Sequence, residues 1–164
     1  MKKALVVLTV LLSLFALSNI SYAASGSAII PYFHAETTTG INYTKIYISN
    51  ITNNPINVKV TLFSKDGTIF KNVGNLIYRS ENLENFNTNL SDASLSYTLY
   101  NNKSSMIMFT HVANEFGYGL IEWTQDSDSV YGLVAMGKEV QNPNKDFRGD
   151  PVFTNYPINN GLPF

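Results

Sequence analysis

Residues 117–137 read GYGLIEWTQDSDSVYGLVAMG, two largely apolar and aromatic runs on either side of the short polar segment 125–128. This composition is typical of two strands joined by a tight turn, so the stretch predicts a β-hairpin. A strand with one solvent-facing side shows a polar residue at every second position, whereas these runs are apolar on both sides. We therefore expect both strands in the middle of a packed β structure.

Alternation of apolar and polar residues predicts further strands before this stretch. The pattern is clearest in residues 56–63, where every second side chain is Ile, Val or Leu. Pro31 marks residues 27–35 as an edge strand, because proline cannot donate a hydrogen bond to a ladder. The turn signals Asn-Pro at 54–55 and Asp-Gly at 66–67 predict a meander of paired neighbouring strands. The other expected strands are residues 43–50, 68–70, 94–100 and 104–112, the last of them apolar on both sides and central.

The number of strands and the turn signals between them indicate the fold class. Seven to eight short strands, without sustained helical spacing, predict an all-β antiparallel β-sandwich, immunoglobulin-like or jelly-roll-like, over residues 24–140. Residues 71–93 sustain neither period and predict a long surface excursion with one short strand at 76–79. Residues 141–164 contain four prolines and predict an extended tail that packs on the domain or on a neighbouring copy.

The N-terminal residues have the layout of a secretory signal peptide. Lys2 and Lys3 precede an apolar run over residues 4–17, and a small-x-small cleavage site ends at Ala23. We therefore expect residues 1–23 to be removed and the mature chain to be secreted or held at the cell surface. The apolar run is shorter than the ~20 residues that span a bilayer, so we expect no stable membrane insertion after cleavage.

The charge of the mature chain bears on its partners, and its cysteine content bears on how the fold is stabilised. Removal of Lys2 and Lys3 from the eleven Lys and Arg leaves nine, against twelve Asp and Glu. The positive charges are not clustered, which argues against nucleic acid as a partner. The sequence has no cysteine, so an exported domain of this kind must be held together by packing alone.

The order of these motifs resembles that of small bacterial β-sandwich proteins, among them the sensory rhodopsin transducer group. The matching segments are IPY at 30–32, YISN at 47–50, VKVT at 58–61 with Asp-Gly at 66–67, and GLIEW at 119–123, followed by Asp126 and the strand after Gly132. The resemblance implies an antiparallel sandwich, often oligomeric and non-enzymatic, that binds a protein or a carbohydrate. The signal peptide sets this chain apart from the cytoplasmic transducers.

The residues that catalysis or metal binding would need are sparse. His34 and His111 are the only histidines, each within an apolar strand pattern that predicts a structural role. Asp126 and Asp128 offer two oxygens to a calcium ion, but Asp is also an ordinary turn residue, and the sequence leaves ion binding there open. Glu122 has no second carboxylate placed for glycoside hydrolysis. We expect no enzymatic activity, no metal and no cofactor.

Three tyrosines, Tyr43, Tyr47 and Tyr100, fall on the polar sides of their strands. Exposed tyrosine rings can stack on sugars or peptides, although cross-strand pairing within a sheet is an equally good explanation. The sequence thus predicts a secreted, non-enzymatic bacterial protein with a structural or assembly role at the cell surface, spore or matrix. The alternative is a carbohydrate- or peptide-binding module that uses these tyrosines. The expected partners are further copies of the chain, a glycan or a surface protein.

Overall fold

The computed structural model describes residues 23–36, 41–70, 84–89, 94–109, 115–127, 129–142 and 152–164. These residues form nine strands with antiparallel ladders throughout, which confirms the predicted all-β antiparallel fold. The elements are β1 (Ala23–Glu36), β2 (Ile41–Asn50), β3 (Ile56–Ser64), β4 (Glu84–Asn89), β5 (Ser94–Leu99), β6 (Ser104–Phe109), β7 (Glu115–Asp126), β8 (Leu133–Asn142), β9 (Val152–Pro157) and the 3-10 turn η2 (Asn159–Gly161). In the described part of the chain, no helix has the length and apolar character needed to cross a membrane.

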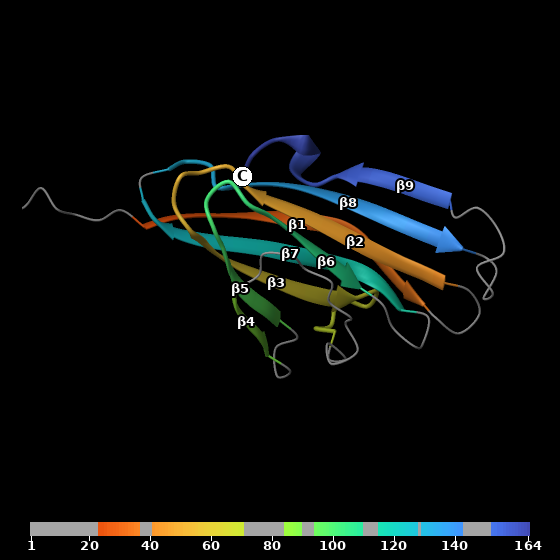
Figure 1. The fold of residues 1–164 in the computed structure, drawn as a ribbon. Helices are drawn as coiled ribbons and strands as arrows, with labels where there is room; N and C mark the ends of the chain where they lie inside the picture. The colour runs from red at the N-terminus through yellow and green to blue at the C-terminus, as the bar shows by residue number, and fades with distance from the viewer. Residues whose placement is uncertain are drawn as a thin grey trace, which may run out of the picture.

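One hydrogen-bonded sheet folds over itself into two layers (Figure 1). The first layer, sheet I, has the strand order β4-β5-β3-β7-β1, and the second, sheet II, has the order β6-β2-β8-β9. The layers are continuous where the end of β1 pairs with the start of β2, with Ala35 opposite Tyr43 and Glu36 opposite Asn42. The fold is therefore an antiparallel β-sandwich with one hydrogen-bonded corner.

The inner faces of the two sheets enclose one apolar core. Inward side chains alternate with outward ones, as in β3, where Ile56, Val58 and Val60 are buried. Aromatic rings join the layers, since the Phe33 ring of β1 lies 5.8 Å from the Phe109 ring of β6. Burial of each large apolar side chain contributes about 1.5–3 kcal/mol, so this core stabilises both sheets together.

Trp123 of β7 is the largest side chain of this core and is 1% exposed. Two glycines leave room for its indole. A Cβ at Gly26 would lie 2.5 Å from Nε1, and a Cβ at Gly132 would lie 2.9 Å from Cδ2. Both distances are shorter than a van der Waals contact between heavy atoms. A side chain at either glycine would therefore displace the ring on which the core is centred.

The predicted hairpin over residues 117–137 is wrong. In sheet I, β7 pairs with β1 and β3, whereas in sheet II β8 pairs with β2 and β9. The segment between β7 and β8 crosses from one sheet to the other. The expected central position is confirmed, because each strand has a neighbour on both sides. Apolar periodicity shows that a strand is buried but does not specify its partners.

The predicted meander is wrong at its first turn. β2 pairs with strands of sheet II and β3 with strands of sheet I, so residues 51–55 cross between the layers. The Asn50 side chain fixes this crossing, because its Nδ2 donates to the carbonyl oxygens of Asn54 (2.8 Å) and Leu99 (3.0 Å). Its Oδ1 accepts a hydrogen bond from the Thr52 amide at 2.8 Å. An Asn-Pro pair predicts a turn, but it does not determine whether the flanking strands pair.

The second turn, at Asp66 and Gly67, is confirmed. Gly67 has a φ of 81°, a conformation that costs glycine little. The Asp66 carboxylate accepts hydrogen bonds from the Thr68 amide (3.0 Å) and hydroxyl (2.7 Å). The chain then returns antiparallel, but in the described residues the strand expected at 68–70 is only a single bridge between Ile69 and Phe63.

β1 is the last strand of sheet I, and the edge position predicted for residues 27–35 holds for the residues before Ala35. It pairs with β7 along its length, and within the described ranges it meets β2 only through its last two residues. Its register with β7 shifts between Ile30 and Phe33, which places Pro31 in a bulge. A proline at a bulge removes no ladder hydrogen bond.

The C-terminal residues contain a strand that the proline pattern did not predict. β9 pairs with β8 at six register positions. After it, Ile158 and Phe164 are buried in the core, and the Phe164 amide donates to the Leu133 carbonyl at 2.9 Å. In this chain the C-terminal segment therefore packs on its own domain.

Some predictions fall outside the described residues, namely residues 1–22 of the leader, the strand at 76–79, His111 and Asp128. Ala23, the predicted cleavage site, is the first residue of β1 and lies opposite Asp126. Within the predicted excursion at 71–93, residues 84–89 form β4 and pair with β5.

Candidate functional site

The outer face of sheet II carries apolar, aromatic and cationic side chains. On β2 the buried residues Thr44, Ile46 and Ile48 point into the core, so the residues between them point outward. Residues directly opposite each other in an antiparallel ladder share a face, which identifies the outward residues of the neighbouring strands. We call this set the methionine–tyrosine face: Tyr43, Lys45, Tyr47, Met106, Met108, Val134, Met136, Lys138, Val140 and Phe153.

The ladder registers arrange most of this face in three rows across sheet II. The rows are Tyr43, Val140 and Phe153; Met108, Lys45 and Lys138; and Met106, Tyr47 and Met136. Every methionine of the sequence except Met1 lies in them. Methionine is flexible and polarizable, so it adapts to partners of different shape. Phe153 is 52% and Met136 is 44% exposed, whereas Val140, between Tyr43 and Phe153, is 3% exposed. The apolar surface that the rows present to solvent is therefore concentrated at Met136 and Phe153.

The charge on this face is positive. Lys45 lies directly opposite Lys138 in the β2–β8 ladder. The Lys45 ammonium is 5.5 Å from the centre of the Tyr43 ring, and the Lys138 ammonium is 4.0 Å from the centre of the Phe153 ring. Each such cation–π contact contributes about 0.5–1 kcal/mol at an exposed site. The described residues of the face include no acidic side chain, so the two cations are not neutralised across it.

A shallow depression of about 360 Å³ adjoins this face, between β8 and β9. Its lining is mostly apolar and includes Val134, Met136, Tyr156 and Pro157. The depression extends the exposed apolar surface from β8 onto the C-terminal strand.

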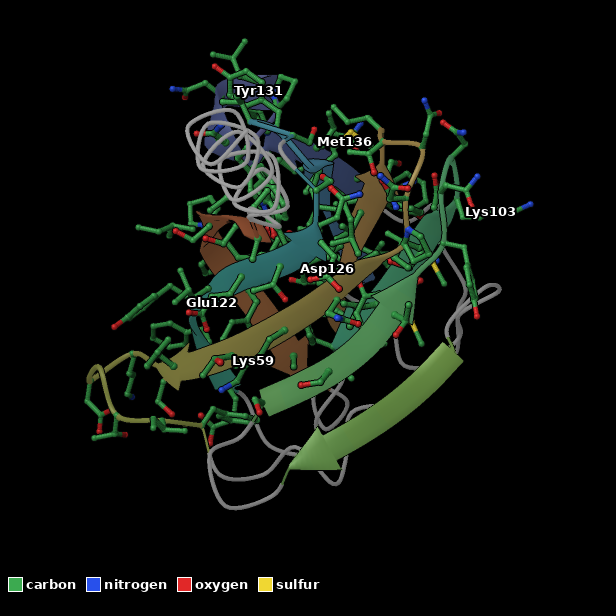
Figure 2. All side chains as sticks on the ribbon, turned by 90° about the vertical axis from the view of Figure 1, so that its left-hand side faces the viewer. Lys59, Lys103, Glu122, Asp126, Tyr131 and Met136 are labelled. Atoms are coloured by element: carbon green, nitrogen blue, oxygen red, sulfur yellow. The ribbon has the colours of Figure 1, made fainter. Side chains whose placement is uncertain are left out.

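The outer face of sheet I has different chemistry where β1, β3, β5 and β7 lie side by side. Its central part, which we call the serine–threonine face, comprises Ser25, Ser27, Asn57, Lys59, Ser96, Thr98, Glu122 and Thr124. Lys59 lies opposite Glu122, so positive and negative groups are neighbours there. Figure 2 shows Lys59 and Glu122 close together and away from Met136. Most of these residues line an open depression of about 500 Å³.

The structure brings together two of the three tyrosines predicted to bind a ligand. Tyr43 and Tyr47 are half-buried on the methionine–tyrosine face, with Lys45 between them on β2. Tyr100 follows β5 of sheet I, and its carbonyl accepts a hydrogen bond from the Lys103 amide at 3.2 Å. Tyr100 therefore belongs to the turn before β6 and not to the face that holds the other two. The sequence did not reveal Lys138 as the neighbour of Lys45 or Met136 as the neighbour of Tyr47, because only the ladder register shows these pairs.

A second polar cluster lies inside one end of the sandwich. His34 Nδ1 lies 3.4 Å from Glu139 Oε1, and the two side chains are 15% and 12% exposed. Thr44 Oγ1 accepts a hydrogen bond from the His34 amide at 2.9 Å. The Tyr156 hydroxyl donates to the Tyr32 carbonyl at 2.6 Å. This cluster thus connects four strands, β1, β2, β8 and β9, at the corner between the sheets.

The electrostatics of this cluster keep its tyrosines protonated. Burial, followed by the nearby Glu139 carboxylate, raises the pKa of Tyr156 far above its usual value. The same two causes raise the pKa of Tyr32. Tyr156 is therefore a hydrogen-bond donor at neutral pH, and its hydrogen bond to the Tyr32 carbonyl links β9 to β1. The sequence predicted a structural role for His34 but not its partner, because Glu139 is far away in the chain.

The turn residue Asp126 lies at the exposed end of β7, opposite Ala23. Among the described residues, no three His, Cys, Asp or Glu side chains lie close enough to hold a metal ion. Asp128 is outside the described residues, so ion binding by the Asp126–Asp128 pair stays untested.

Comparison with known proteins gives no family assignment. No family model matches the chain. No curated protein matches it either. Among solved structures, the crystal structure of Thermotoga maritima 1070 is similar, with a TM-score of 0.48 and 6% sequence identity over 80% of this chain and 90% of that one. The resemblance to the sensory rhodopsin transducer group stays a prediction.

Proposed function

We propose that this protein is a secreted, non-enzymatic bacterial protein with a structural or assembly role at the cell surface, spore or matrix. The layout of residues 1–23 supports export. The observation that carries the assembly role is the methionine–tyrosine face, because exposed apolar side chains such as Met136 and Phe153, grouped on one face of a folded domain, are typical of an interaction site. The serine–threonine face is the internal reference, since it has the polar composition of a solvated sheet surface.

The contact we propose is heterologous, with this face of one copy against a different surface of the next copy. Two such faces packed on each other would bring the Lys45 and Lys138 ammonium groups of both copies together, and like charges at close range oppose association. A heterologous contact produces a ring if it closes and a filament if it does not. Either product suits a structural role outside the cell.

Light scattering coupled to size exclusion tests the proposal on residues 24–164 over a range of concentrations. We expect a defined oligomer or filament for the parent chain, and monomers for the double variant Met136→Glu, Phe153→Glu. The matched control is Ser27→Glu with Thr124→Glu, which adds the same charge to exposed positions of the serine–threonine face. A parent chain that stays monomeric at every concentration overturns the assembly role. Equal loss of association in both double variants overturns the assignment to this face.

The second candidate function is a carbohydrate- or peptide-binding module. It is favoured by one observation, that Tyr43 and Tyr47 share an outer face with a cation between them. Retention of the parent chain on glycan or cell-wall columns is the test, and we expect Tyr43→Ala and Tyr47→Ala to abolish it without unfolding the domain. Failure of the parent chain to bind any such column contradicts this candidate.

A further inference from the structure

We infer that the methionine–tyrosine face binds an acidic polysaccharide, a polymer of sugar rings that carry carboxylate groups. The inference rests on the second candidate function and names its ligand class. Two kinds of residue carry it: the cations Lys45 and Lys138, and the rings of Tyr43, Tyr47 and Phe153.

The first step concerns the two cations. Lys45 and Lys138 are direct cross-strand neighbours, an arrangement that places their Cβ atoms about 4.5–5.5 Å apart and is unfavourable for like charges. The outward residues next to them in the ladders are Met108 and Asn155, which carry no charge. Among the described residues of this face nothing compensates the positive charge of the pair, and a bound anion would relieve the repulsion.

The second step concerns where the two ammonium groups lie. Lys45 extends over the Tyr43 ring and Lys138 over the Phe153 ring. Tyr43 and Phe153 both lie opposite Val140, so they belong to the same row of the face. Both lysines therefore lean in one direction, and both cations lie beside aromatic rings. A ligand that meets these groups together must combine negative charge with an apolar ring surface.

The third step concerns the spacing of the rings. Tyr43 and Tyr47 are four residues apart on one strand, which is about 13 Å at a rise of about 3.3 Å per residue. Phe153 lies two strands from Tyr43, which adds about 10 Å across the sheet. Rings distributed over such distances contact several units of a polymer. Tyrosine also offers a hydroxyl to the sugar, besides its apolar ring.

The shape and the charge of the domain disfavour other ligands. The three rows lie on a sheet surface, whereas small molecules prefer concave pockets that enclose most of their surface. Nucleic acid would need more clustered positive charge than two lysines in a chain of net negative charge. An extended peptide usually adds to the edge of a sheet and not to its face. A carboxylated sugar chain matches both the cations and the rings.

Titration calorimetry with polygalacturonate at low salt tests this inference on residues 24–164. We expect binding that weakens in high salt and that falls about tenfold in the double variant Lys45→Gln, Lys138→Gln. The methyl ester of the same polymer keeps the sugar rings but lacks the charges, and we expect it to bind the parent chain as weakly as polygalacturonate binds the variant. Lys59→Gln, next to Glu122 on the serine–threonine face, is the matched control and should keep the parent affinity.

The inference is overturned if the parent chain does not bind polygalacturonate, if the ester binds as tightly as the acid, or if Lys59→Gln weakens binding as much as the double variant. Equally tight binding of polyglutamate also overturns it, because sugar rings would then contribute nothing. Light scattering in the absence of polymer scores the assembly role separately. Failure of the polysaccharide to bind therefore does not decide whether the chain associates with itself, and the reverse also holds.

Discussion

The serine–threonine face and the methionine–tyrosine face lie on the outer surfaces of two sheets that share one core. In the central part of sheet I the residues that alternate with the core are Ser, Thr, Asn and a Lys opposite a Glu, as expected of a surface in contact with water. Outside this part the same sheet also exposes Ile29, Phe116 and Tyr118. On sheet II the corresponding residues are Met, Tyr, Phe, Asn155 and two Lys that lie opposite each other. Since fold and core are common to both, the difference does not arise from folding. Our proposal attributes this difference to a partner that contacts the methionine–tyrosine face.

The largest expected effect concerns the core that both faces share. We expect Trp123→Ala to lower the free energy of unfolding by about 3–5 kcal/mol, because it leaves a cavity between Gly26 and Gly132. Trp123→Phe should cost less, because it retains an aromatic ring and removes an indole N–H that has no hydrogen-bond partner among the described residues. Urea denaturation measures both. A cost below 1 kcal/mol for Trp123→Ala would show that the two faces do not depend on a common centre.

The next effect concerns β9, which brings Phe153 to the methionine–tyrosine face. Tyr156→Phe removes the hydroxyl that bonds the Tyr32 carbonyl, and we expect a loss of about 1 kcal/mol at pH 7. The pKa of Tyr156 is raised in the folded state. The contribution of this side chain to the free energy of unfolding is therefore complete at a pH below the ordinary tyrosine pKa of about 10, and it is lost as the pH rises above that value.

Denaturation of the parent chain and Tyr156→Phe between pH 8 and pH 11.5 checks this sign. The stability advantage of the parent chain should shrink as the pH increases. An advantage that stays constant or grows over this range would contradict the assigned role of Tyr156.

A smaller effect separates binding from stability at Tyr47. Its neighbours across the strands are Met106 and Met136, and such pairs contribute about 0.2–1 kcal/mol. We therefore expect Tyr47→Ala to lower the free energy of unfolding by about 0.5–1 kcal/mol while it abolishes glycan retention. Thr124→Ala on the serine–threonine face should change neither property appreciably. Unchanged retention in Tyr47→Ala would leave sheet stabilisation as the only role of this ring.

The smallest effect lies at the turn after β3 in sheet I. Hydrogen bonds from Thr68 hold the pKa of the Asp66 carboxyl below its usual value. The stabilisation is therefore present above the unfolded pKa and is lost as pH falls through the folded pKa. We expect the difference in unfolding free energy between the parent chain and Asp66→Ala to vanish in acid. The two proteins should be retained equally on glycan columns. A difference that persists at pH 2 would refute this account of the turn.

The sequence predicted those parts of the fold that depend on neighbouring residues. Alternation predicted β3 and its buried side chains, and the Asp66-Gly67 turn followed from the conformational freedom of glycine. It did not predict that β7 and β8 lie in different sheets, because a period of two does not encode the partner strand. β9 was missed since it is short and lies next to prolines.

Prediction of the candidate site from the sequence was limited in the same way. Tyr43 and Tyr47 were predicted from alternation within one strand, whereas the Lys45–Lys138 pair needed the register of two distant strands. Residues 104–112 are apolar on both sides and predicted a central strand, yet within the described residues β6 (Ser104–Phe109) pairs with β2 alone. Its outward Met106 and Met108 belong to the methionine–tyrosine face. These outward apolar residues were interpreted as a sign of a central strand, whereas in the structure they are part of the candidate site.

Methyl NMR of methionine tests the central claim most directly, because Met106, Met108 and Met136 are the only methionines of residues 24–164 and all lie on the proposed interaction face. Spectra of methyl-labelled protein are recorded at increasing protein concentration and, separately, with polygalacturonate. The account predicts that all three methyl signals shift or broaden when the chain associates or binds. Association or binding that leaves all three signals unchanged would contradict it.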